Sequence, residues 1–200
     1  MTHSRQVPWN RYVVFFGIAL FGCALDLATK RWMFDLLGSP FEKPTFWVWE
    51  GVLGVTTSLN EGTLFSLGQG AAPLFAALSV IVCVGVTVWL FYYQAARDLP
   101  LTAALGCVAA GAMGNFYDRA GLSGLRWTYA NALHQVGEPV HAVRDWIDFR
   151  LIHWPIFNIA DSLIVCGTVV LSWRLMTDSV AAAREETESF AGDQRASVGG

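Results

Sequence analysis

Four long apolar runs, separated by polar segments, dominate the pattern of hydrophobic positions along the chain. A helix needs roughly 20 consecutive apolar residues to cross a bilayer, and each of these runs is about that long. We therefore predict four membrane-spanning helices, at about residues 12–32, 73–93, 99–117 and 155–176.

The segments between the runs predict the topology. Spans two and three are joined by the short hairpin QAARDL, whereas two long connections, about residues 34–72 and 118–154, join the other spans. Four crossings place both long connections on one side of the membrane and both termini on the other. The first connection contains TFWVWEGVLGVTTSLN, whose β-branched and aromatic residues with glycine breaks are typical of strands. The expected fold is a mainly α membrane protein of four transmembrane helices with a small β-rich unit over about residues 40–70.

Composition agrees with this fold and excludes some functions. Of the 200 residues, 54% are hydrophobic and 14% are charged, and the mean hydropathy of +0.42 is too high for an ordinary soluble domain. The formal net charge of −3, with no block of basic residues, argues against a nucleic-acid partner. We predict an N-terminal segment over residues 1–11, a membrane domain over 12–176, and a polar, disordered tail over 177–200.

Small residues recur on the third span. Gly106, Ala110 and Gly114 are spaced four residues apart, which places them on one face of a helix. Such a stripe lets a neighbouring helix approach closely. We interpret it as a packing feature.

Polar residues gather where the spans meet the two long connections. Helix capping and a local ion pair between Asp26 and Lys30 explain part of this pattern. They do not explain two carboxylates, Asp148 and Asp161, on either side of the entrance to the fourth span. Because all these positions fall on one side of the membrane, we predict a single polar cluster of Asp26, Lys30, Asn60, Gly62, Asn115, Asp118, Arg119, Asp148, Asn158 and Asp161.

Two neighbouring carboxylates favour acid–base hydrolysis. One carboxylate takes a proton from water while its protonated partner donates to the scissile carbonyl, and two close carboxyls share a proton because both cannot ionise cheaply. The chain has no H-E-x-x-H sequence of the kind that zinc proteases use. The alternative is a four-span transporter or binding protein that uses the same polar cluster for ligands or protons. Transporters normally place such groups nearer the bilayer midplane and have more spans.

Five sequence motifs, in order along the four spans, carry a resemblance to a known family. They are DLATK, NEGTLFS, GAMGNFYDR, DWIDF and PIFNIADSLIVCG. Over about residues 12–176 the chain resembles the lipoprotein signal peptidases (signal peptidase II). The resemblance implies an aspartyl endopeptidase of the bacterial inner membrane that removes signal peptides from prolipoproteins. These enzymes cut just before a cysteine that already carries diacylglycerol. It also implies cytoplasmic termini, an active site at the periplasmic face, a periplasmic cradle over residues 40–70, and neither metal nor cofactor.

The resemblance also assigns roles to residues. Carried over by motif, the catalytic pair is Asp148 of IDF and Asp161 of FNIAD, and the neighbouring Asp145 is set aside because IDF aligns better than RDW. Asn115 and Arg119 correspond to polar residues that line the substrate site, and Asp118 is expected to hold the site together. Further signature positions are matched by Asn158, Asn60, Gly62, Asp26 and Lys30.

One connection departs from the family pattern. The chain between Arg119 and Asp148 is longer than in typical members, so residues 121–142 are expected to form an inserted surface loop. The expected partners are the diacylglyceryl-modified prolipoprotein and membrane lipid, and the protein is expected to be a monomer.

Overall fold

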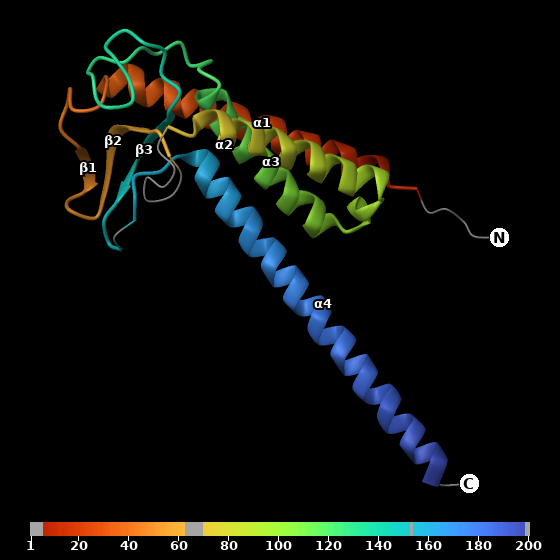
Figure 1. Ribbon diagram of the computed structural model, residues 1–200. Coiled ribbons are helices and arrows are strands. Elements are labelled where there is room, and N and C mark those ends of the chain that lie inside the picture. The colour runs from red at the N-terminus through yellow and green to blue at the C-terminus, as the bar shows by residue number, and fades with distance from the viewer. Residues whose placement is uncertain (1–5, 63–69, 153, 199–200) are drawn as a thin grey trace.

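The computed structural model describes residues 6–62, 70–152 and 154–198. Its helices and strands are α1 (Trp9–Leu37), β1 (Phe46–Trp49), β2 (Leu53–Asn60), α2 (Ala72–Thr87) with a π-helical turn η2 (Val88–Tyr92), a 3₁₀ turn η3 (Ala95–Arg97), α3 (Leu99–Arg119), β3 (Val143–Phe149) and α4 (Ile159–Val198). Figure 1 shows α1, α2 and α3 running side by side, with the sheet at one end and both chain termini away from it.

Four helices of the described chain are long and apolar enough to cross a membrane, which confirms the predicted number of spans. They are Trp9–Leu37, Ala72–Tyr92, Leu99–Arg119 and Ile159–Val180. The first helix is longer than predicted at both ends. Asp26 and Lys30 pair within this helix, which continues to Leu37.

The small residues of α3 face α1, as the stripe predicted. A β-carbon at Gly106 would lie 3.2 Å from Ile18. One at Gly114 would lie only 2.3 Å from Oδ2 of Asp26, a distance that no real β-carbon tolerates. The missing side chain at Gly114 therefore lets the Asp26 carboxylate of α1 lie directly against α3.

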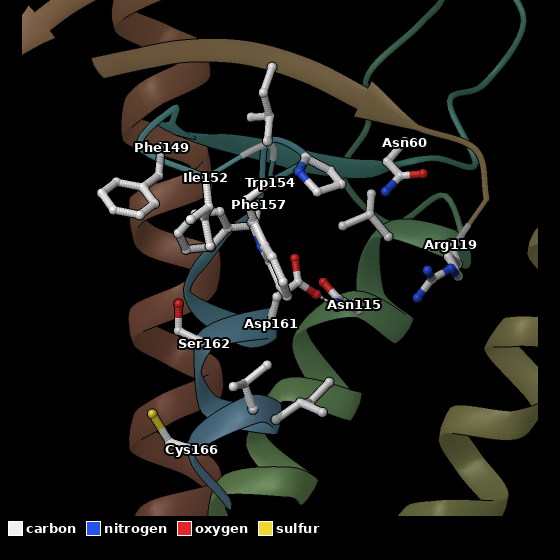
Figure 2. A pocket seen from close by; sticks show the side chains of 15 residues that line it. Asn60, Asn115, Arg119, Phe149, Ile152, Trp154, Phe157, Asp161, Ser162 and Cys166 are labelled. Carbon is white, nitrogen blue, oxygen red and sulfur yellow. Dashed lines mark hydrogen bonds between the residues drawn. The ribbon is translucent and has the colours of Figure 1, made fainter. Parts of the chain in front are cut away.

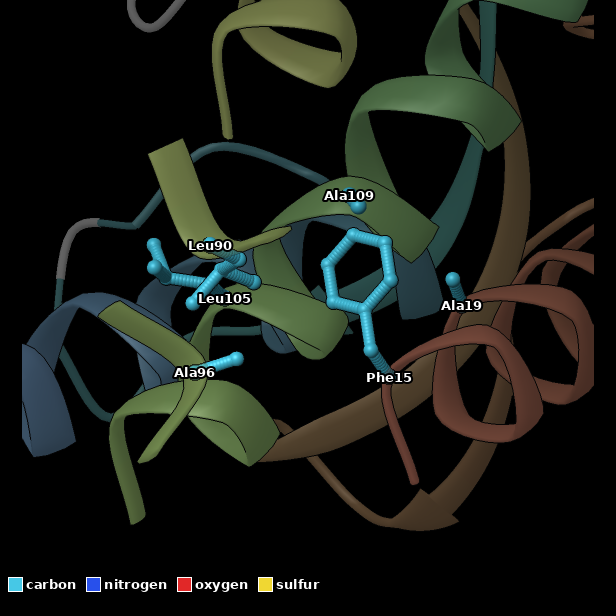
Figure 3. Close-up of a cluster of buried hydrophobic side chains, with 6 residues drawn as sticks. All are labelled: Phe15, Ala19, Leu90, Ala96, Leu105 and Ala109. Carbon is cyan, nitrogen blue, oxygen red and sulfur yellow. The ribbon is translucent and has the colours of Figure 1, made fainter. Parts of the chain in front are cut away.

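An apolar core packs the helices together at the end of the bundle away from the sheet. The buried side chains come from α1, η2, η3 and α3 (Figure 3), and they are Phe15, Ala19, Leu90, Ala96, Leu105 and Ala109. Because this core fixes the helices to one another far from the sheet, it holds their polar ends in register at the sheet.

The three strands form one antiparallel sheet in the order β1-β2-β3. Strands β1 and β2 lie within the predicted β-rich segment, whose residues 63–69 lie outside the described residues. The third strand comes from the second long connection, and in it Asp145 pairs with Ser58 of β2 and Asp148 with Gly54. The sheet thus joins the two connections and places acidic residues of β3 beside the start of α4.

The last helix extends further than expected. Helix α4 is 40 residues long and continues through residues 177–198, for which the composition predicts a disordered tail. The sequence AAAREETE in this part is rich in strong helix formers, so a helix already started in the membrane can propagate through it.

Candidate active site

A buried lysine organises the polar ends of α1 and α3. The side chain of Lys30 is fully buried, and its Nζ lies 2.7 Å from Oδ2 of Asp26 and 3.1 Å from Oδ2 of Asp118. Its third partner is Oδ1 of Asn115, at 2.9 Å. Two carboxylates and one amide oxygen thus surround the buried ammonium group. The predicted local pair of Asp26 and Lys30 is therefore part of a larger buried network.

A second buried cation, Arg144 of β3, also binds this network. Its Nε donates to Oδ1 of Asp118 at 2.7 Å, and its backbone N–H donates to Oδ2 at 3.2 Å. Asp118 thus ties β3 to α3. Arg144 is not among the residues that the sequence motifs single out. Its position directly before Asp145 was the only available signal.

The start of α4 is held by side chains from three segments. Asn158 caps the helix, because its Oδ1 accepts from the backbone N–H of Asp161 at 2.9 Å. In return the carboxylate of Asp161 accepts from the backbone N–H of Asn158 at 3.3 Å. Oδ1 of Asp26 accepts from the N–H of Ala160 at 2.9 Å. These bonds fix the direction in which the Asp161 carboxylate points.

Asp145 lies beside Asp161 and shares one hydrogen-bonding partner, Asn158, with it. The Asn158 amide donates to Oδ1 of Asp145 at 2.6 Å, and the Asn60 amide donates to Oδ2 at 3.3 Å. On the other carboxylate, the Asn115 amide donates to Oδ1 of Asp161 at 2.8 Å. Two carboxyl groups from β3 and α4 are thus held by one set of asparagines.

Asp148 does not join this cluster, so the structure does not bring together the two carboxylates that the motifs pair. Side chains of a strand alternate between its two faces, so Asp148, three residues after Asp145, points to the opposite face. There Asp148 is bound by Arg150 at 2.7 Å, and the guanidinium of Arg150 lies over the ring of Trp47. Asp145, which the motif alignment had set aside, takes the place beside Asp161.

Arg119 connects the end of α3 to the end of β2. Its guanidinium donates to the backbone carbonyl of Gly62 at 3.0 Å and lies over the ring of Phe75. Gly62 in turn donates its N–H to the side-chain oxygen of Asn60 at 3.0 Å. All the predicted site residues except Asp148 therefore belong to one hydrogen-bonded network.

A pocket of about 650 Å³ opens beside this network. Figure 2 shows Asp161 and Asn115 pointing toward each other within it, with Ser162 and Cys166 further along α4. Most of its wall is apolar, and Asp161, Asn115, Arg119 and Asn60 supply polar groups at one end. Its other lining residues are Val143, Phe149, Ile152, Trp154, Pro155, Ile156, Phe157, Ser162, Ile164, Val165 and Cys166. The pocket can therefore hold a largely apolar molecule with a polar group against Asp161.

The environment of Asp145 favours its protonated form. Burial is the main cause, the nearby charge of Asp161 adds to it, and together they raise the pKa of the Asp145 carboxyl to about 8. The charge of Lys30 and the amides of Asn158 and Asn60 oppose this rise in the pKa. At neutral pH the site therefore holds one carboxyl that can donate a proton.

This raised pKa predicts a pH dependence of stability. An unfolded aspartate titrates near pH 3.9, so between about pH 4 and pH 8 the folded protein holds a proton at Asp145 that the unfolded chain has released. The free energy of unfolding should then fall as the pH rises through this window. Thermal unfolding in detergent, measured across it, should show this slope in the wild type and a flatter profile in Asp145→Asn. Parallel profiles would contradict the raised pKa.

Comparisons with known proteins point to one family. The family model described as Signal peptidase (SPase) II matches residues 18–177. A lipoprotein signal peptidase of Rhodopirellula baltica is 42% identical over 173 residues, which are 85% of this chain and 74% of the relative. One of a Synechocystis species is 34% identical over 177 residues, covering 85% of this chain and 92% of the relative. A solved structure described as a bacterial membrane enzyme aligns with a TM-score of 0.67 at 27% identity, covering 82% of this chain and 88% of that one.

Four spans with this site at one end, together with the family match, define a multi-pass membrane peptidase of the aspartic type. Transport, the alternative use of the same polar cluster, is not supported by these matches. The chain belongs to the signal peptidase II family.

Proposed function

We propose that this protein removes the signal peptide from diacylglyceryl-modified prolipoproteins, cutting just before the lipidated cysteine, with Asp145 and Asp161 as the acid–base pair. The observation that supports this pair is a hydrogen-bonding partner that the two residues share. Asn158 donates its side-chain amide to Asp145 and its backbone N–H to Asp161. Within the described part of the chain no such bridge reaches Asp148, which is paired with Arg150 instead.

The two carboxyls take different roles because their surroundings differ. Asp145 is buried and holds a proton at neutral pH, since its pKa is raised to about 8, so it acts as the acid. Asp161 lines the pocket and lies in the first turn of α4, where the helix dipole favours a negative charge. It therefore acts as the base.

The reaction follows from these roles. The Asp161 carboxylate takes a proton from water as the water oxygen bonds to the scissile carbonyl carbon, and Asp145 donates its proton to the carbonyl oxygen. Asp161 then gives its proton to the leaving amine of the cysteine as the C–N bond breaks. One hydroxyl group of the tetrahedral intermediate gives its proton to Asp145 as the new carboxyl group forms. Both residues therefore end in their starting states.

The apolar wall of the pocket is suited to binding a lipidated substrate. Ile164, Val165 and Cys166 line it along the membrane-spanning part of α4, so an acyl chain can lie against this helix while the peptide reaches Asp161. We place the protein in the bacterial inner membrane as a monomer, with the sheet and the site at the periplasmic face and both termini in the cytoplasm.

The test uses the purified protein in lipid and a model prolipoprotein whose cysteine either carries diacylglycerol or does not. We expect mass analysis to find cleavage directly before the cysteine of the lipidated form and little or none of the unmodified form. Equal cleavage of both forms would contradict the substrate class. An intact lipidated substrate would contradict the proposed function altogether.

A further inference from the structure

The long connection between α3 and β3, residues 120–142, folds back onto the end of β2. Within it, the backbone N–H of Trp127 donates to the carbonyl of Glu138, and that of Val140 donates to Leu125, so the loop is a short hairpin. Trp127, Val140 and Ala142 are buried together and pack against Leu59 of β2. The hairpin therefore has a small apolar core that includes the residue before Asn60.

The same loop also holds the residue after Asn60. The Asn131 amide donates to Oε1 of Glu61 at 3.2 Å, and Nε2 of His134 lies 3.5 Å from the same oxygen. The imidazole of His134 is buried and lies flat on the indole of Trp127, with ring centroids 3.5 Å apart. The contact to Glu61 is thus built on the apolar core of the hairpin.

Asn60 lies between these two anchored neighbours. Its amide donates to Asp145, and its side-chain oxygen accepts from Gly62, whose carbonyl binds Arg119. A small shift of the strand at Leu59 or Glu61 would move the Asn60 amide away from the carboxyl of Asp145. The 3.3 Å length of that hydrogen bond leaves little room for such a shift.

We propose that the 120–142 hairpin positions Asn60 for catalysis by holding Leu59 and Glu61, and that the Asn131–Glu61 hydrogen bond is the polar contact through which it does so. Asn131 and Glu61 are positioning residues. This inference rests on the proposed pairing of Asp145 with Asp161. It assigns a role in the reaction to a loop that the sequence analysis treated as a surface excursion.

Asn131→Asp isolates the contact from the fold of the loop. Oδ1 of Asn131 accepts from the backbone N–H groups of Leu133 and His134, and an aspartate keeps that acceptor. The change replaces only the amide donor by an oxygen that repels the Glu61 carboxylate. Gln135→Glu is the matched control, because it makes the same amide-to-carboxylate exchange on an exposed side chain of the same loop.

We expect kcat of Asn131→Asp on the lipidated substrate to fall by roughly tenfold or more with little change in KM, because misplacing a reacting group by about 1 Å can cost 10²-fold. Because the Asn60 amide favours the charged form of Asp145, its loss should also move the alkaline limb of the kcat profile to higher pH. Gln135→Glu should stay within about twofold of the wild type in kcat.

The double variant Glu61→Gln with Asn131→Asp gives the decisive comparison. It exchanges donor and acceptor, so the glutamine amide can donate to the new carboxylate, and we expect it to recover most of the lost kcat. A wild-type kcat in Asn131→Asp, an equal loss in Gln135→Glu, or a double variant no better than Asn131→Asp would each overturn the inference. A wild-type protein that fails to cleave the lipidated substrate would instead overturn the proposed function.

Discussion

Asp161→Asn and Asp145→Asn should each abolish cleavage of a lipidated prolipoprotein. Asparagine is nearly isosteric with aspartate but can neither accept a proton from water nor donate one to the substrate, and general acid–base catalysis contributes roughly 10² to 10⁴-fold. Because the two carboxyls act as a unit, the double variant should be little slower than either single variant. The measurement is the rate of product formation in lipid at saturating enzyme.

Asp148→Asn is the matched control for this pair. Asp148 lies on the same strand, three residues after Asp145, but it faces Arg150. We expect its rate to stay close to that of the wild type. If Asp148→Asn were inactive while Asp145→Asn still cleaved, the pair proposed here would be wrong and the motif alignment right.

Lys30→Met should strongly destabilise the fold. Methionine has nearly the same length as lysine but no charge, so Asp26 loses its cation and Asp118 retains only Arg144. Removing one partner from a buried ion network costs about 3–5 kcal/mol. Thermal unfolding in detergent should show a much lower midpoint, and if the variant cannot be purified, its amount in the membrane fraction gives the same comparison.

Arg31→Met, at the next position, serves as the control. Arg31 and its partner Asp35 are exposed and lie 3.5 Å apart, and exposed ion pairs contribute at most about 1 kcal/mol. Its unfolding midpoint and membrane level should therefore be close to those of the wild type. Lys30→Met behaving like Arg31→Met would show that the buried lysine is dispensable for the fold.

Hydropathy located the spans well because a bilayer imposes a minimum length on each. It gave α2 and α3 within a few residues, but it ended the first span early. The ion pair of Asp26 and Lys30 was predicted, and the structure shows that it lies well inside α1, which continues to Leu37. Local composition likewise predicted β1 and β2, whereas β3 depends on pairing with β2 and was expected only as a loop.

Most of the site was predictable because its residues fall at the ends of predicted helices. The choice between Asp145 and Asp148 was not. Strand alternation requires them to face opposite ways, but the sequence does not say which face of VRDWIDF looks toward α4. That choice depends on the register with β2 and on the burial of Arg144 against Asp118, both of which are long-range.

The division of the carboxyl pair between β3 and α4 also has a consequence for biogenesis. Asp145 is synthesised before the last crossing, but Asp161 and its capping partner Asn158 belong to that crossing and take their geometry from the start of α4. A nascent chain whose fourth span has not yet entered the bilayer carries half of the pair and lacks the asparagine that bridges it. On the proposed pairing of Asp145 with Asp161, the site is therefore complete only after the final helix has been inserted.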